Sequence, residues 1–101
     1  MAAALRSDFE PCYIELVHVL HVANHRSLRA TIVSALDSGA SQIVVDCAGW
    51  ERLDLSVLSA LVQGANACGL RGATFELVNL GRDLQADIRA LRLGTRLGLA
   101  A

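Results

Sequence analysis

Three short apolar segments of the chain have the pattern of β-strands. The clearest is Ser41–Cys47, whose centre Ile43–Val45 is an unbroken β-branched run. Such a run indicates a strand covered on both faces, so we expect it to be buried centrally in a sheet. Cys12–Val19, which alternates apolar and polar residues, is predicted as a second strand, also central because of its apolar content. Ala73–Asn79 is predicted as a third.

Three helices are predicted between and after these strands, at Arg26–Ser38, Ser56–Cys68 and Arg82–Arg92. Each repeats apolar residues at the helical period along one face. The expected inward residues are Leu28, Ile32, Ala35 and Leu36 in the first helix, Leu58, Leu61, Val62 and Ala65 in the second, and Leu84, Ile88 and Leu91 in the third. Asn24 is a suitable N-cap for the first helix, and Gly39 lies where a glycine commonly ends one.

The alternation of strands and helices favours an α/β fold with right-handed crossovers. We expect a mixed, mostly parallel sheet of four to five strands packed with amphipathic helices, within a single domain spanning residues 1–101. Residues 1–10 are predicted as either an edge strand or a loose terminus. Residues 94–101 either fray or dock their leucines on the core.

Composition limits the classes of partner. The formal net charge is −1 without a basic block, which argues against nucleic acid and anionic membrane surfaces. The uncharged run Leu55–Leu70 has 16 residues, fewer than the ~20 mostly apolar residues that span a bilayer, so no membrane insertion is expected. Met1–Leu5 is too short for a signal-peptide core, and a cytoplasmic location is predicted.

Enzyme, metal and cofactor hypotheses find little support in the sequence. No Gly-rich phosphate loop is present. The spacing of His18, His21 and His25 crosses from a strand toward a helix, so the three rings are not expected to converge on a metal. The three cysteines, at positions 12, 47 and 68, are interpreted as reduced, small hydrophobic residues. We therefore expect a protein that is not an enzyme and needs no cofactor or metal.

One motif carries a family resemblance. Asp46 ends the IVVD strand, and after seven residues Asp54-Leu55-Ser56-Val57-Leu58 opens an apolar helix. This arrangement resembles the centre of a STAS domain, the family of anti-sigma-factor antagonists and of the cytoplasmic ends of sulphate transporters. In that family a buried strand ends in Asp, and Asp-Ser-Ser-Gly-Leu opens the next helix. The resemblance covers roughly Ile14 to Leu93 and implies a STAS-like α/β fold.

The resemblance also implies a function. The second serine of the family motif is the phosphorylation site of the antagonists and falls on Ser56. The chain is then an antagonist-like regulatory protein that docks on an anti-sigma factor or serine kinase and is released by phosphorylation. Leu55 and Val57 replace the usual Ser and Gly, and these departures fit an alternative at least as well: a STAS subunit of a lipid-transport or permease ATPase, without control by phosphate.

The predicted contact surface surrounds Ser56. We assign partner binding to Asp54, Leu55, Ser56, Val57, Trp50 and His21. His21 stands where antagonists carry an acidic residue, in a connection that usually reads Gly-Glu-Leu-Asp. Simpler roles remain open beside these: Asp54 or Ser56 as a helix cap, Asp46 as an acceptor for loop N–H groups, and Trp50 as a cover for one end of the core.

Overall fold

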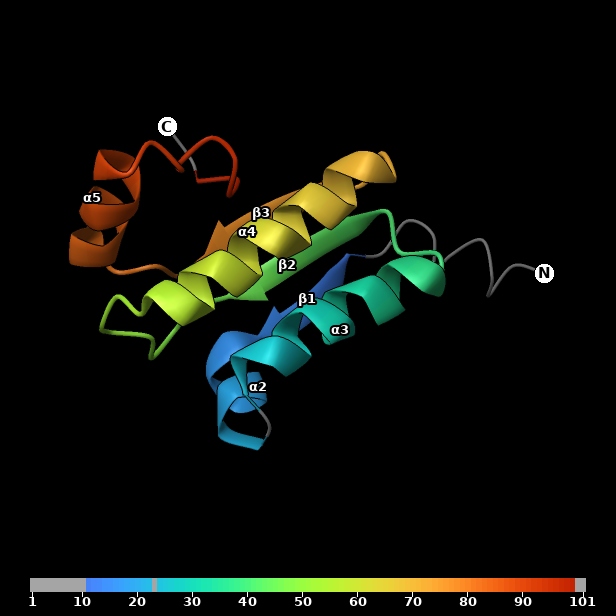
Figure 1. The fold of residues 1–101 in the computed structure, drawn as a ribbon, viewed down its shortest axis with the longest axis horizontal. Coiled ribbons are helices and arrows are strands. Elements are labelled where there is room, and N and C mark those ends of the chain that lie inside the picture. Colours follow the sequence, from blue (N-terminus) through green and yellow to red (C-terminus); the bar gives the residue numbers. More distant parts are fainter. Residues whose placement is uncertain (1–10, 23, 100–101) are drawn as a thin grey trace.

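A computed structural model describes residues 11–22 and 24–99, whose arrangement is shown in Figure 1. The elements, in chain order, are β1 (Cys12–Glu15), α2 (Leu16–Val22), α3 (His25–Asp37), β2 (Gln42–Asp46), α4 (Leu55–Leu70), β3 (Thr74–Val78) and α5 (Arg82–Ala90). The three predicted helices are confirmed to within two residues at each end. The predicted strands at β2 and β3 are also confirmed.

The described strands form one parallel sheet in the order β1-β2-β3. Ile43 of β2 pairs with Cys12 on one side and with Phe75 on the other, and Val45 pairs with Ile14 and Leu77. The whole Ile43–Val45 run is buried. The central position of this run is therefore confirmed, while a fourth or fifth strand and a mixed sheet are not found among residues 11–22 and 24–99. The possible edge strand at 1–10 lies outside the described residues.

Helices α3 and α4 lie side by side over one face of the sheet (Figure 1). Leu28 and Ile32 of α3 and Leu58 and Leu61 of α4 join the strand residues in one hydrophobic core. The two helices approach closely at Gly64, where an added Cβ would collide with the Ile32 side chain. A glycine at this position therefore allows α3 and α4 to pack closely against each other.

The prediction that Cys12–Val19 is one strand is wrong beyond Glu15. β1 ends there and the chain continues directly as α2, with Leu16 fully buried. The cause lies in the pairing. Glu15 is opposite Asp46, the last residue of β2, so a longer β1 would have no neighbour to bond. Nor is β1 central in the described sheet, because it lies at one end of the strand order.

The C-terminal segment packs back against the sheet. Leu97 is fully buried, and Leu93 and Leu99 pack against the core. Through Leu99 these leucines therefore lie against the core, and residues 100–101 lie outside the described part of the chain. The inward placement predicted for Leu91 is wrong. α5 ends at Ala90, and Leu91, its C-cap, is 48% exposed. None of the helices in the described ranges combines the length and apolarity needed to cross a membrane.

Candidate functional site at the start of helix α4

The site begins where β2 ends. Oδ1 of Asp46 accepts hydrogen bonds from the Ala48 backbone N–H (3.0 Å) and from Nδ2 of Asn79 (3.1 Å). The Ala48 bond, followed by the Asn79 bond, lowers the pKa of Asp46 from its usual 3.8. Asp46 thus joins the turn after β2 to the residue after β3, which is the structural role open to it from the sequence.

Asp54 is the N-cap of α4. Its Oδ1 accepts from the backbone N–H groups of Ser56 (2.8 Å) and Val57 (3.2 Å). A carboxylate in this position satisfies two of the unpaired N–H groups of the first turn and complements the positive end of the helix. Since Asp54 supplies the cap, the Ser56 hydroxyl is not needed for it, and the Ser56 side chain is exposed.

The residues on either side of Ser56 have opposite environments. Leu55 is 70% exposed, a large apolar side chain on the surface. Val57 is 5% exposed and belongs to the core. Of the two departures from the family motif, Leu55 therefore changes the surface offered to a partner. Val57 changes the packing beneath it, and its side chain presents little surface to a partner.

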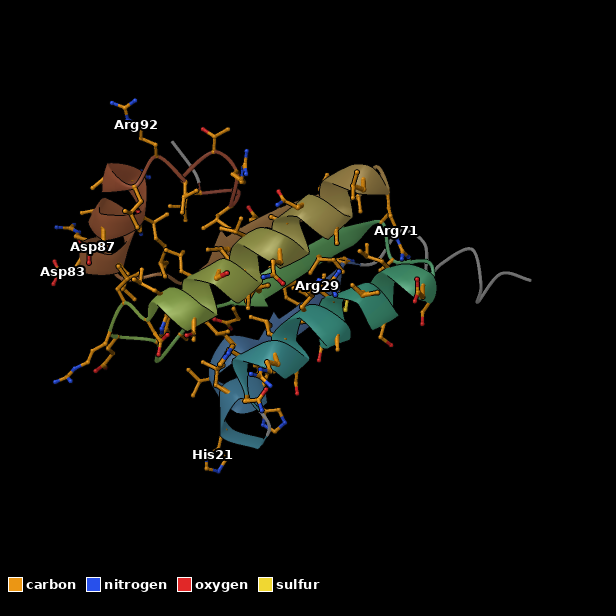
Figure 2. All side chains as sticks on the ribbon, viewed as in Figure 1. His21, Arg29, Arg71, Asp83, Asp87 and Arg92 are labelled. Atoms are coloured by element: carbon orange, nitrogen blue, oxygen red, sulfur yellow. The ribbon has the colours of Figure 1, made fainter. Side chains whose placement is uncertain are left out.

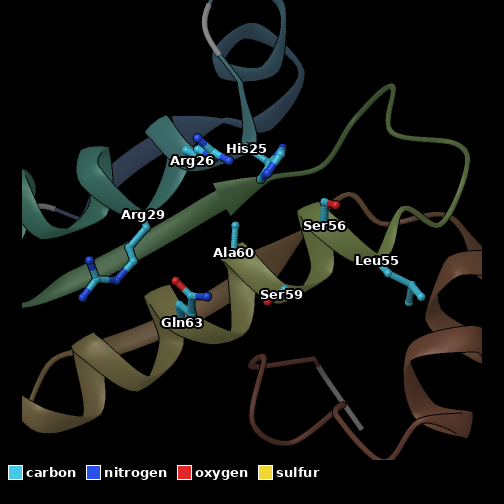
Figure 3. A pocket seen from close by; sticks show the side chains of 8 residues that line it. All are labelled: His25, Arg26, Arg29, Leu55, Ser56, Ser59, Ala60 and Gln63. Carbon is cyan, nitrogen blue, oxygen red and sulfur yellow. The ribbon is translucent and has the colours of Figure 1, made fainter.

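Basic residues of α3 lie across from Ser56. His25, Arg26 and Arg29 line a hollow of about 540 Å³ together with residues of α4, namely Leu55, Ser56, Ser59, Ala60 and Gln63. Figure 3 shows His25 and Arg26 of α3 on one side of this hollow and Ser56, Ala60 and Gln63 of α4 on the other, while Leu55 extends away at the start of α4. None of its lining residues is acidic. The sequence pattern did not predict these side chains as part of the site, although Arg26 and Arg29 lie off the apolar face of their helix.

The remaining two predicted contact residues lie elsewhere. Trp50 is 8% exposed and packs in the core, and it also lines a smaller hollow beside Gly81 and Arg82. This burial favours the alternative that Trp50 covers one end of the core. His21 is exposed on α2 and points away from the rest of the chain (Figure 2). It does not line the hollow at Ser56, whereas His25 does.

The cysteines and histidines do not form a reactive cluster. Cys47 is buried, and its pKa is raised to about 12, first by burial and then by the neighbouring charge of Asp46. Burial also raises the pKa of Cys68. Both thiols therefore stay protonated near neutral pH, the unreactive form. Within the described ranges, no three His, Cys, Asp or Glu side chains are placed to hold a metal ion.

Comparison with known proteins gives one positive result. A family model described as "Mlab, STAS domain" matches residues 3–99, nearly the whole chain. No curated protein and no solved structure matches. The matched range contains the Asp46-to-Leu58 motif, the parallel strands on either side of it and both helices that line the hollow. On this evidence the chain belongs to the STAS domain family.

Proposed function

We propose that the protein is a regulatory binding module of the anti-sigma-factor-antagonist kind, which docks on an anti-sigma factor or serine kinase and is switched by phosphorylation of Ser56. The observation that carries this proposal is the position of Ser56. It is the second residue of α4, its side chain is exposed, and it shares a hollow with His25 and Arg26 while Asp54 supplies the cap.

The start of α4 is suited to receive a phosphate without loss of the fold. A phosphate on Ser56 adds a charge of about −1.5 to −2 at the positive end of a helix, where anions are stabilised. The imidazole and guanidinium groups across the hollow would be further favourable neighbours. We therefore expect the phosphorylated domain to stay folded.

The same phosphate would release the partner. A partner that covers Ser56 would have to remove water from the phosphate, and the desolvation of such a charge costs several kcal/mol even with cations nearby. The unphosphorylated protein would hold the anti-sigma factor away from its sigma factor, and phosphorylation would end that hold. ATP would bind to the kinase partner. We propose a binding role without catalysis for this chain.

Leu55 favours a second candidate function, a STAS subunit of a lipid-transport or permease ATPase without control by phosphate. This side chain occupies the place of the usual first serine and is 70% exposed on the first turn of α4. Exposure of a leucine side chain to water is unfavourable, and its burial in a lasting apolar contact with a partner is favourable. Replacement of the usual glycine by the buried Val57 also makes the turn stiffer than in the antagonist motif.

The proposed switch is tested by titrating Ser56→Asp and Ser56→Ala against the cognate anti-sigma factor. Ser56→Asp should bind more weakly than the parent protein. Ser56→Ala should bind normally and become insensitive to incubation with the kinase and ATP. Ser34→Asp, which adds the same charge at an exposed position of α3, is the matched control and should bind like the parent. Thermal melts of each variant check that the fold is retained.

Two outcomes contradict the proposal in different ways. Loss of binding by both Ser56 variants indicates that Ser56 only supports the packing of the helix start. Undiminished binding by Ser56→Asp, together with no incorporation of phosphate, rules out the switch and leaves the transporter candidate. Affinity purification that recovers a transport ATPase instead of a kinase supports the same conclusion.

A further inference from the structure

The hollow at Ser56 is one end of a longer groove between α3 and α4. A second hollow, lined by Arg29, Gln63, Asn66, Ala67 and Leu70, shares Arg29 and Gln63 with the first. The two hollows therefore follow one another along the helix pair, from Leu55 at the start of α4 to Leu70 at its end. At about 1.5 Å per residue, this groove is about 22 Å long, or roughly four helical turns.

The α4 side of the groove lacks the charges of an ordinary solvated face. No residue of α4 is charged along its 16 residues, although much of the helix is exposed. Leu55, Ser59, Gln63, Asn66 and Leu70 are all exposed and follow the spacing of one helical face. Leu55 and Leu70, at the two ends, are 70% and 89% exposed. Absence of charge together with large apolar anchors is typical of the centre of a protein–protein interface.

The α3 side of the groove is basic. His25, Arg26 and Arg29 line it, and no acidic residue lines either hollow. The acidic residue of α3, Asp37, lies at the end of that helix and forms an ion pair with Arg71, the C-cap of α4. Among residues 11–22 and 24–99, neither Arg26 nor Arg29 forms an ion pair. Two guanidinium groups thus face the groove with no carboxylate of the described chain to neutralise them.

We propose that the α3–α4 groove binds an amphipathic, acidic helix of a partner protein. Leucine anchors at both ends, about four turns apart, would contact apolar side chains of such a helix. Its carboxylates would pair with Arg26 and Arg29 at the edge of the groove, since arginine matches the geometry of a carboxylate. A nucleic acid fits less well, because no Phe, Tyr or Trp side chain lines either hollow to stack on its bases.

This inference extends the proposed function and names the chemistry of the partner. It also offers a route for the switch. Ser56 lies at the end of the groove that holds Arg26. A phosphate there would compete with the carboxylates of the partner for the same cation and would repel them. Either a kinase or a transport ATPase could supply the acidic helix, so the inference does not require phosphorylation.

The test uses a pair of synthetic helical peptides and the isotope-labelled full chain. Both peptides are about four turns long, with leucines on one face, and they differ only in carrying glutamates or lysines beside that face. The glutamate peptide should shift the amide signals of residues lining both hollows, among them Arg29, Gln63 and Leu70, and its affinity should fall as salt is raised. The lysine peptide should leave these signals unchanged.

Matched variants locate the binding. Arg26→Ala and Arg29→Ala should each weaken the glutamate peptide about fivefold, since an ion pair at an exposed edge contributes up to about 1 kcal/mol. Leu70→Ser should weaken it as well. Arg82→Ala makes the same change of charge on α5, outside the groove, and should bind like the parent.

The inference is overturned if the glutamate peptide does not bind, if both peptides bind equally, or if the α3 arginine variants bind like the parent. If anionic vesicles or a single-stranded oligonucleotide bind through the same arginines more tightly than the glutamate peptide does, the groove does not bind an acidic helix. The result is separable from the proposed switch. If the kinase controls partner binding but the Arg26 and Arg29 variants bind the partner like the parent, only the groove proposal fails. If the glutamate peptide binds but the kinase adds no phosphate to Ser56, only the proposed switch fails.

Discussion

A single carboxylate oxygen of Asp46 holds together two loops beside the site, through Ala48 and Asn79. These bonds lower the pKa of Asp46 in the folded protein from 3.8. The ionised form is thus favoured by folding. Its contribution to stability is present above the unfolded-state pKa and is lost as the pH falls through the lower, folded-state value.

Asp46→Asn should therefore lower the free energy of unfolding at neutral pH, and the difference from the parent should shrink as the pH falls below 3.8. Urea denaturation at a series of pH values measures this. Glu51→Gln, at an exposed loop position, is the control and should show no such change. A constant difference between Asp46→Asn and the parent at every pH would contradict the prediction.

The three cysteines should differ in reactivity because their burial differs. Cys47 and Cys68 are buried with raised pKa values, while Cys12 is half-buried on β1. Since the thiolate is the reactive form, iodoacetamide at pH 8 should label Cys12 first, and the other two only in urea. Mass spectrometry of the digested protein identifies the labelled thiols. Labelling of Cys47 in the folded protein at the rate of Cys12 would show that the loop after β2 opens readily.

Within α4, two positions on opposite faces of the helix test which face packs in the core. Leu61 is fully buried, whereas Ser59 is exposed. Leu61→Ala should destabilise the protein by about 2–5 kcal/mol, through lost burial and the cavity left behind. Ser59→Ala, on the outer face, should cost under about 1 kcal/mol. Urea denaturation of both variants measures the two effects, and equal losses would mean that the faces of α4 are wrongly assigned.

The sequence predicts some elements well because their signals are local. The β-branched run of β2 is formed by consecutive residues. The cap and the apolar repeat of α4 are likewise formed by residues that are close in the sequence. The end of β1 has no such signal. Leu16 to Val22 reads as alternating and β-branched, so propensity favours a strand. The strand nevertheless stops at Glu15, where its neighbour β2 ends, a limit set by tertiary pairing.

The candidate site divides in the same way. Asp54 and Ser56 could be predicted from the spacing of one motif, because a cap and the first turn it serves are adjacent in the chain. The basic side of the hollow could not. Arg26 and Arg29 lie far from Ser56 in sequence and line the same hollow only because α3 packs against α4 over the sheet. The closeness of those helices depends in turn on Gly64, a residue with no distinctive sequence pattern around it.

At the scale of the whole molecule, the C-terminal segment packs directly against the backbone of β3 at Gly98. This residue has a φ of +69°, and a Cβ there would collide with the Phe75 carbonyl oxygen and lie 2.9 Å from Cα of Glu76. Backbone atoms of a strand cannot move aside as the end of a side chain can. The preceding Leu97 is fully buried, so the close approach at Gly98 holds that side chain in the core.

Gly98→Ala should therefore destabilise the protein by about 1–3 kcal/mol, through strain at a positive φ and overpacking against the strand. Gly94→Ala is the matched control, because its Cβ would lie 3.4 Å from Cγ of Arg89, a flexible side chain, and 3.8 Å from Cδ1 of Leu99. At about 4–8 °C per kcal/mol for a domain of this size, thermal melts resolve the two variants. Hydrogen exchange then gives the location: Gly98→Ala should speed exchange in β3 and at Leu97 while β1 stays protected. Equal melting of both variants would mean that the segment is not anchored on β3, and that Leu97 contributes little to the core.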